Sequence, residues 1–174
     1  ATLPNFPAEI RAPQGTLAGV SSFQVHLAAH DILTPGDAPD VLVAMNPAAL
    51  RANLGDLRKG ASIIVDSHDF TNRNLSRAGY SENPLENGSL EDFDVTAFDL
   101  TDLTVEAVKD FGLSRKDAGR AKNMFALGLL SWMYGRPTDS TITFLERRFA
   151  KAPDIRDANV TSFKAGWNFG ETTE

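Results

Sequence analysis

Two short apolar runs separated by a helical pattern constrain this chain more than any other feature. Val41–Met45 and Ile63–Val65 are continuous apolar runs bounded by turn residues, which is typical of strands covered on both faces. Between them, Asn46 is placed to cap a helix that has Pro47 in its first turn and good helix formers over Ala48–Leu57. Strand–helix–strand crossovers normally leave both strands parallel. The pattern therefore predicts an α/β fold with an open, mainly parallel sheet flanked by helices.

Further elements are predicted on either side of this unit. Val95–Phe98 reads as another strand, and Thr101–Phe111 reads as a helix closed by Gly112. Residues 19–29 alternate between apolar and polar side chains and predict a half-buried strand. Thr71–Asp94 shows little periodicity, so it is predicted as a long loop, either with an interfacial role or simply disordered.

The last third of the chain is predicted to be helical. Ser114 is placed to cap one helix, with Asp117 three positions later as a capping-box variant. Met124–Tyr134 is apolar nearly all round and should be the most buried helix, and its Gly128 and Ser131 form a small-residue face that admits a close backbone. The amphipathic run Thr141–Ala150 and a last helix from about Asp154 complete this part.

Composition narrows the classes of function. The 174 residues suit one domain, and the net charge of -6 argues against a nucleic-acid partner. There is no cysteine, and no apolar run reaches the ~20 residues that span a bilayer. A cytoplasmic protein without membrane association is therefore expected. No P-loop, complete dinucleotide fingerprint or zinc-spaced ligand set occurs, so we expect no catalytic, cofactor or metal site within this chain alone.

The segment Pro4–Gln24 holds the best candidate site residues. Three prolines and two glycines punctuate it, so its polar side chains Glu9, Arg11 and Gln14 should be held in defined positions. A structured turn with an exposed ion pair is the alternative, and such pairs are worth only ~0–1 kcal/mol.

Three other polar features have two interpretations each. Asn46 should sit at the carboxyl end of a parallel strand, where ligands bind in such sheets, or it only caps the following helix. Asp66–Asp69 has the residue types of a hydrolase triad, but consecutive side chains point apart, so loop capping by its two aspartates is favoured. Asn123 lies in an apolar helix and would need hydrogen-bond partners there, whereas Lys122 is free to point to solvent.

Four ordered motifs resemble one known family. Pro4–Gly15 (PNFPAEIRAPQG) resembles the glutamate-any-arginine loop of the gamma domain in 2-oxoacid:ferredoxin oxidoreductases, most like the alpha subunits of the 2-oxoglutarate type. Asp40–Asn46 (DVLVAMN) resembles the family's strand ending in asparagine, Lys122–Gly128 (KNMFALG) resembles its buried helix, and Lys164–Glu171 (KAGWNFGE) fits its ending. The family's gamma domain begins with a strand and a glycine-rich turn before the loop, whereas this chain starts at Ala1 with neither. The resemblance therefore implies one gamma-type domain over residues 1–174, truncated at its N-terminus and cut from a longer alpha subunit.

The resemblance also implies an activity. The whole enzyme would oxidatively decarboxylate 2-oxoglutarate with coenzyme A to succinyl-coenzyme A and carbon dioxide, and would reduce ferredoxin. Thiamine diphosphate, magnesium and a [4Fe-4S] cluster would lie in the remaining domains of the alpha subunit and in a beta subunit, with the alpha–beta pairs dimerised. This domain would cover the active site or assist coenzyme A, with Glu9, Arg11, Gln14 and Asn46 on that side, and the isolated fragment would be inactive.

Two alternatives remain open. In the first, the domain is a non-catalytic structural or docking module of a pyruvate-type 2-oxoacid:ferredoxin oxidoreductase, and its loop only fixes it to neighbouring domains. In the second, it is a stand-alone hydrolase that uses Ser67 and His68.

Overall fold

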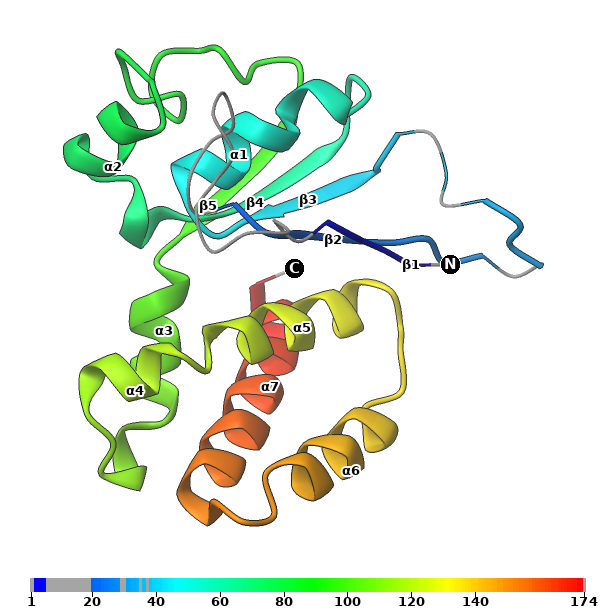
Figure 1. Cartoon of the computed structure of the whole chain (residues 1–174), viewed down its shortest axis with the longest axis vertical. Coiled ribbons are helices and arrows are strands. Elements are labelled where there is room, and N and C mark those ends of the chain that lie inside the picture. The colour runs from blue at the N-terminus through cyan, green and yellow to red at the C-terminus, as the bar shows by residue number, and fades with distance from the viewer. Residues whose placement is uncertain (1, 6–19, 29–30, 35, 37, 174) are drawn as a thin grey trace. The chain divides into compact units, whose positions relative to one another are not determined.

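The computed structural model describes residues 2–5, 20–28, 31–34, 36 and 38–173 of the chain. It forms two compact units, Ala1–Phe98 (unit 1) and Asp99–Glu174 (unit 2). Unit 1 contains strands with two short helices, and unit 2 contains helices (Figure 1). Within the described residues, none of the helices combines the length and the apolar character that crossing a bilayer requires.

A three-stranded parallel sheet forms the centre of unit 1. It consists of β3 (Val41–Ala44), β4 (Ser62–Asp66) and β5 (Asp94–Phe98), in the order β3-β4-β5. The crossover from β3 to β4 contains α1 (Pro47–Asn53) and one turn of 3-10 helix, Leu54–Asp56. The predicted strand–helix–strand unit and the α/β fold are confirmed.

The core of unit 1 lies between this sheet and the segments that follow its strands. Ile63 and Val65 of β4 and Leu50 of α1 are fully buried, and they pack with Leu75 and Leu90 from the connection between β4 and β5. At about 25 cal/mol per Å² of apolar surface, burial of each such side chain stabilises the fold by ~1.5–3 kcal/mol. β4 is the covered central strand that its apolar run predicted, whereas β3 lies at an edge of the described sheet and is half-buried over Val41–Val43, so the prediction of a central strand is wrong for β3.

The connection between β4 and β5 agrees only in part with the predicted long loop, because α2 occupies its start, whereas residues 78–93 form turns and bends without helix or strand. It begins with a turn of 3-10 helix, Ser67–Asp69, and with α2 (Asn72–Arg77), which Thr71 caps. Later in the segment, the Asn83 side chain accepts a hydrogen bond from the Leu85 amide at 3.1 Å, and the Asn87 side chain accepts one from the Ser89 amide at 3.0 Å. Such Asx turns give asparagines a structural role that a list of helix breakers does not reveal.

The N-terminal part of unit 1 corrects two expectations. A strand, β1 (Thr2–Asn5), stands at the start of the chain, where none was expected, and pairs antiparallel with β2 (Ser22–Val25). The predicted strand is thus present over Ser22–Val25, but its faces are reversed. Phe23 and Val25 are 57% and 51% exposed, whereas Ser22 and Gln24 are half-buried. Alternation fixes the period of a strand, but not which face other elements cover.

Unit 2 is made of helices, as predicted for the end of the chain. They are α3 (Leu100–Ala107), α4 (Arg115–Gly119), α5 (Lys122–Met133), α6 (Asp139–Arg148) and α7 (Pro153–Thr173), with a 3-10 turn at Lys109–Phe111. Gly112, with a φ of 64°, ends the 3-10 turn that follows α3, as a C-terminal glycine does. The Ser114 hydroxyl accepts from the Asp117 amide at 3.2 Å and donates to the Asp117 carboxylate at 2.7 Å, which confirms the predicted cap.

Helices α5 and α7 touch backbone to backbone. A side chain added at Gly128 would overlap the Phe163 carbonyl, and one added at Gly166 would overlap the Phe125 carbonyl. Ser162 of α7 donates a 2.9 Å hydrogen bond to the Ala121 carbonyl immediately before α5. These contacts place the first half of α5 against the middle of α7. The small-residue face predicted for α5 does admit a close backbone.

Two expectations about α5 are wrong. Asn123 is exposed, because it lies in the first turn on the side away from α7. Lys122 is half-buried, and its Nζ donates to Thr101 Oγ1 at 3.2 Å, so it does not simply point to solvent. Leu127 remains 39% exposed, so α5 is not buried all round.

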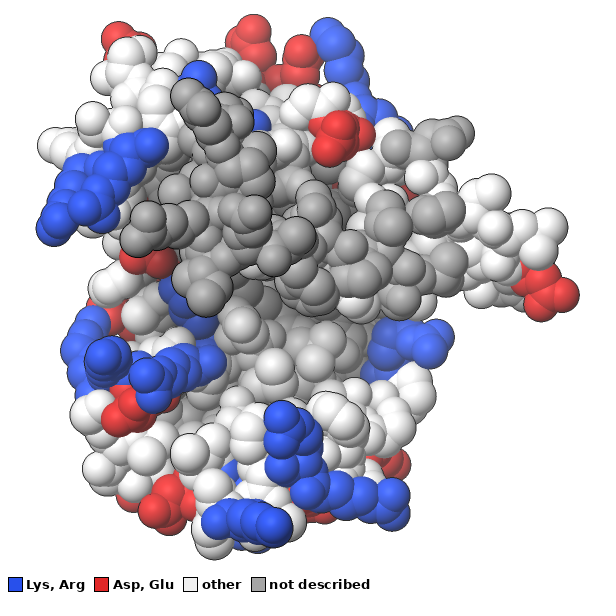
Figure 2. Space-filling model, viewed as in Figure 1, with Lys and Arg blue, Asp and Glu red and all other residues white. Residues whose placement is uncertain are grey.

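The charges of the chain divide unequally between the units. Residues 1–98 contain twelve Asp and Glu against six Lys and Arg, whereas residues 99–174 contain eleven of each. The whole net charge of -6 therefore belongs to unit 1. Figure 2 shows Lys and Arg side chains gathered on the displayed face of unit 2.

Candidate functional site

The residues predicted for the candidate site fall in two places. Glu9, Arg11 and Gln14 lie outside the described residues. Asn46 lies in unit 1, directly after β3, at the carboxyl end of the parallel sheet. The structure therefore gives geometry for one of the four predicted residues.

Asn46 forms the N-cap of α1. Its Oδ1 accepts a hydrogen bond from the Ala49 amide at 2.8 Å, and its backbone is extended, as an N-cap requires. Pro47 follows at the first helical position, where its lack of an N–H costs nothing. The capping interpretation is thus confirmed, and the side-chain Nδ2 is the group with which Asn46 would contact a ligand.

The turn after β4 lies at the same edge of the sheet. The register pairs Ala44 with Val65, so the residues that follow β3 and β4 leave the sheet side by side. Asp66 is fully buried, and its Oδ1 accepts from the His68 amide at 3.3 Å. Phe70 N donates to the Ser67 carbonyl at 3.1 Å and closes the 3-10 turn. The predicted loop-capping role of Asp66 is confirmed.

The turn after β4 carries polar side chains that do not form a triad. Ser67, His68 and Asp69 are consecutive on one 3-10 turn, so they do not converge as a catalytic triad does. The Asp69 carbonyl accepts from Asn74 Nδ2 at 2.9 Å, which ties the turn to α2. Ser67 is half-buried and His68 is exposed, so this turn carries a hydroxyl and an imidazole at the carboxyl edge of the sheet.

A third feature of unit 1 was missed by sequence reasoning. The Arg51 guanidinium of α1 lies over the Tyr80 ring, 5.2 Å from its centroid, and donates to the Gly79 carbonyl. Burial raises the pKa of the Tyr80 hydroxyl above its ordinary value of 10.0, and the neighbouring Arg51 charge opposes that shift. The hydroxyl is buried without a hydrogen-bond partner among the described residues. Arg51 and Tyr80 are far apart in sequence and meet only in the folded chain, so no sequence pattern indicates this contact.

The chain belongs to the pyruvate ferredoxin/flavodoxin oxidoreductase family, whose model matches residues 1–169. It is also 62% identical over all 174 residues to the 2-oxoglutarate oxidoreductase subunit KorA of Mycobacterium tuberculosis. The match covers 27% of that relative, so this chain spans about a quarter of its length.

Two solved structures share the fold. One is a 2-oxoglutarate:ferredoxin oxidoreductase from Magnetococcus marinus with 2-oxoglutarate, coenzyme A and succinyl-CoA bound, with a TM-score of 0.64 and 20% identity over 99% of this chain and 26% of that chain. The other is the gamma subunit of a keto/oxoacid ferredoxin oxidoreductase from Geobacter sulfurreducens, with a TM-score of 0.50 and 18% identity over 97% of this chain and 80% of that chain. At this identity the likeness concerns the fold alone, and it agrees with the predicted α/β class.

Proposed function

We propose that this chain serves a 2-oxoglutarate:ferredoxin oxidoreductase, as a gamma-type domain within a longer alpha subunit. The observation that carries the proposal is the 62% identity to the KorA subunit, which extends over every residue of the chain. The enzyme would convert 2-oxoglutarate and coenzyme A to succinyl-coenzyme A and carbon dioxide, and would pass the electrons to ferredoxin. Residues 1–174 would act as one domain in that enzyme.

The remaining cofactors would be held elsewhere in the enzyme. The chain has no cysteine, so it does not offer the thiolates that ligate a [4Fe-4S] cluster. We therefore propose that the cluster, thiamine diphosphate and magnesium belong to the other domains and to a beta subunit. The partners would be that beta subunit and ferredoxin, and the alpha–beta pairs would dimerise.

Within that enzyme, the chain would cover the reacting centre and assist coenzyme A. Oxidative decarboxylation followed by acyl transfer requires water to be excluded first and coenzyme A to be admitted afterwards, which a covering domain achieves. Arg11 would bind a carboxylate or phosphate, because a guanidinium bonds two oxygens at once. Glu9 would orient that guanidinium, and the amides of Gln14 and Asn46 would add contacts.

The negative net charge of unit 1 makes the positive charge of Arg11 important for this role. It is one of six Lys and Arg residues among twelve acidic ones in residues 1–98. An anionic substrate approaching this unit meets a net negative field, so each correctly placed cation there has a large effect on binding.

The test of this role is Arg11→Lys in the full-length alpha subunit assembled with its beta partner. Lysine keeps the charge but loses the two-pronged geometry, so we expect turnover to fall or the KM for coenzyme A to rise by roughly tenfold. Arg77→Lys, at an exposed position on α2, is the matched control and should change neither. Unchanged turnover and unchanged KM in Arg11→Lys would contradict the role.

A second variant, Arg11→Ala, distinguishes the proposed function from the structural alternative. If the loop only fixes a structural module to its neighbours, Arg11→Ala should release the alpha–beta complex into its parts, as seen by size-exclusion chromatography with light scattering. If the loop serves catalysis, Arg11→Ala should leave the complex assembled while turnover falls.

A further inference from the structure

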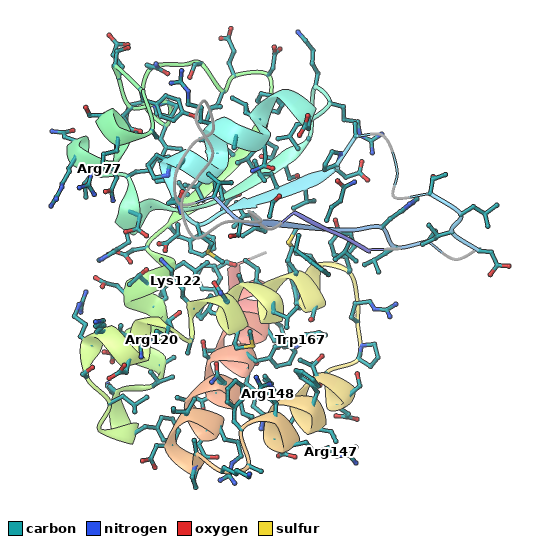
Figure 3. The ribbon with its side chains drawn as sticks, in the orientation of Figure 1. Arg77, Arg120, Lys122, Arg147, Arg148 and Trp167 are labelled. Atoms are coloured by element: carbon teal, nitrogen blue, oxygen red, sulfur yellow. The ribbon has the colours of Figure 1, made fainter. Side chains whose placement is uncertain are left out.

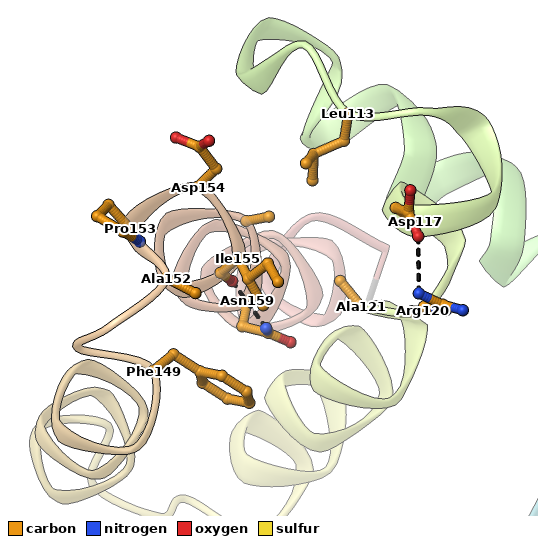
Figure 4. A pocket seen from close by; sticks show the side chains of 11 residues that line it. Leu113, Asp117, Arg120, Ala121, Phe149, Ala152, Pro153, Asp154, Ile155 and Asn159 are labelled. Atoms are coloured by element: carbon orange, nitrogen blue, oxygen red, sulfur yellow. Dashed lines mark hydrogen bonds and ion pairs between the residues drawn. The ribbon is translucent and has the colours of Figure 1, made fainter.

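Unit 2 has an open groove of its own, formed by residues other than those at the carboxyl edge of unit 1. Its volume is about 620 Å³, and it is bordered by the start of α7, the end of α6 and the segment that contains α4 (Figure 4). Apolar side chains dominate it, notably Leu113, Ala121, Phe149, Ile155 and Ala158. Ile155 is 48% exposed, so the apolar floor reaches the surface.

Most polar side chains of the groove are already engaged with neighbours inside unit 2, and Asp154 is the exception among the described lining residues. Asn159 Nδ2 donates to the Ile155 carbonyl at 2.8 Å. Asp117 accepts from Arg120 at 2.7 Å through one oxygen (Figure 4) and from Ser114 at 2.7 Å through the other. Asp154 occupies the first turn of α7, where the helix dipole stabilises a negative charge. The interior of the groove therefore offers an apolar surface and few hydrogen-bonding groups to a binding partner.

Three cations without acidic partners adjoin lining residues of the groove, one through a ring contact and two as neighbours in sequence. The Arg148 guanidinium lies over the ring of Phe149, 5.7 Å from its centroid, and Figure 3 places Arg148 at the end of α6. Lys151 and Lys116 are exposed and adjoin the lining residues Ala152 and Asp117 in sequence. In the part of the chain that the structure describes, Arg148, Lys151 and Lys116 form no ion pair. Asp154 is the one acid of the described lining without an ion pair, so these three cations leave a net positive charge around the groove.

We propose that this groove docks an acidic amphipathic helix presented by a partner polypeptide. Such a helix places apolar side chains at i, i+3, i+4 and i+7 into a groove and leaves its other residues at the rim. Acidic residues at those rim positions would meet Arg148 and Lys151 at one end and Lys116 at the other. A small polar ligand fits less well, because small-molecule sites rely on polar groups that converge inside the pocket. The inference does not depend on the proposed function.

The test uses the full chain and a fluorescein-labelled synthetic helix of about 18 residues, with Leu at the four spacing positions and mostly Glu elsewhere. Fluorescence anisotropy should show saturable binding that weakens as NaCl rises from about 50 mM to 300 mM, because salt screens exposed charges. A scrambled peptide of the same composition should bind at least tenfold more weakly, since its apolar residues no longer share a face. A peptide with Lys in place of Glu should bind no better than the scrambled one.

Variants of the chain locate the binding. The double variant R148E/K151E and the single variant Ile155→Asp should each weaken the acidic helix by roughly tenfold or more. All three positions are exposed, so circular dichroism should show an unchanged fold. Arg77→Glu, an exposed position in unit 1, is the matched control and should leave the affinity unchanged.

Three outcomes would overturn the proposal. The first is an acidic helix that binds no better than its scrambled version. The second is an affinity that neither R148E/K151E nor Ile155→Asp reduces. The third is saturable binding of octanoate by the groove, lost in Ile155→Asp, while the helix does not bind; that result would make the groove a small-molecule pocket.

Discussion

The two units of this chain are stabilised in different ways. Unit 1 buries the side chains of a parallel sheet under its connections, and side-chain caps such as Asn46 and Asp66 hold the turns that leave the sheet. Unit 2 depends on two helices whose backbones touch at Gly128 and Gly166. Unit 1 also carries the whole net charge, whereas unit 2 is neutral. We therefore expect small side-chain changes in unit 1 to have modest effects on the free energy of unfolding. In unit 2, the contact of α5 with α7 leaves no space for an added methyl group.

The largest effect is expected from Gly128→Ala in unit 2. The added Cβ would overlap the Phe163 carbonyl, a backbone atom that moves only if α5 and α7 separate. We expect a loss of about 3 kcal/mol or more in the free energy of unfolding, measured by urea denaturation.

The control for that change is Gly55→Ala in unit 1. No atom lies within 4 Å of a Cβ added at Gly55, so the stability should change by less than about 1 kcal/mol. Equal losses of unfolding free energy in Gly128→Ala and Gly55→Ala would contradict the expected difference between the units.

A smaller effect is expected from Asn46→Ala. The substitution leaves the Ala49 amide without its 2.8 Å acceptor, which should cost about 1 kcal/mol of unfolding free energy. Asn46→Asp retains an oxygen acceptor and should unfold like the wild type. In the assembled enzyme, however, Asn46→Asp replaces the donor Nδ2 with a negative oxygen, so the KM for coenzyme A should rise. If Asn46→Ala raised the KM for coenzyme A and Asn46→Asp did not, Asn46 would act only as a helix cap.

The smallest effect should come from Tyr80→Phe, and it should be stabilising. The phenylalanine removes a buried hydroxyl that has no partner among the described residues, so the unfolding free energy should rise by about 0.5–1 kcal/mol. Denaturant titration of both proteins at neutral pH measures the difference. A loss of stability would show that the hydroxyl has a partner in solution.

The same tyrosine gives unit 1 a pH dependence. Its pKa is raised in the folded state, chiefly because burial disfavours the phenolate, so the unfolded chain loses this proton first. The stability tied to this group is fully present below about pH 10 and is lost as the pH rises through the folded pKa. The wild type should therefore lose stability above about pH 10 more steeply than Tyr80→Phe, as thermal melts across that range would show.

Much of the fold followed from local patterns. The runs at β3 and β4, the N-cap at Asn46, the Ser114 cap and Gly112 are encoded by adjacent residues, and each was predicted. Contacts between distant segments decided the rest. The reversed faces of β2 depend on which side other elements cover.

Two helical segments were misjudged for related reasons. In α2, the asparagines that suggested a loop are used locally, since Asn74 reaches back to the Asp69 carbonyl. In α5, the exposure of Asn123 depends on where α7 packs, which composition does not specify.

The candidate site was only partly predictable. Asn46 was found because the carboxyl end of a parallel strand is a general ligand position, and its cap is local. The Arg51–Tyr80 contact and the groove at Ile155 bring together residues that are far apart in sequence, so no local sequence motif predicts them.

The most direct measurement is an activity assay on the full-length alpha subunit assembled with its beta partner. Reduction of a viologen dye would be followed with 2-oxoglutarate or with pyruvate, each with and without coenzyme A. We expect rapid, coenzyme A-dependent reduction with 2-oxoglutarate and a far lower kcat/KM with pyruvate. Reduction with pyruvate at equal or greater efficiency, or none with either acid, would contradict the proposed function.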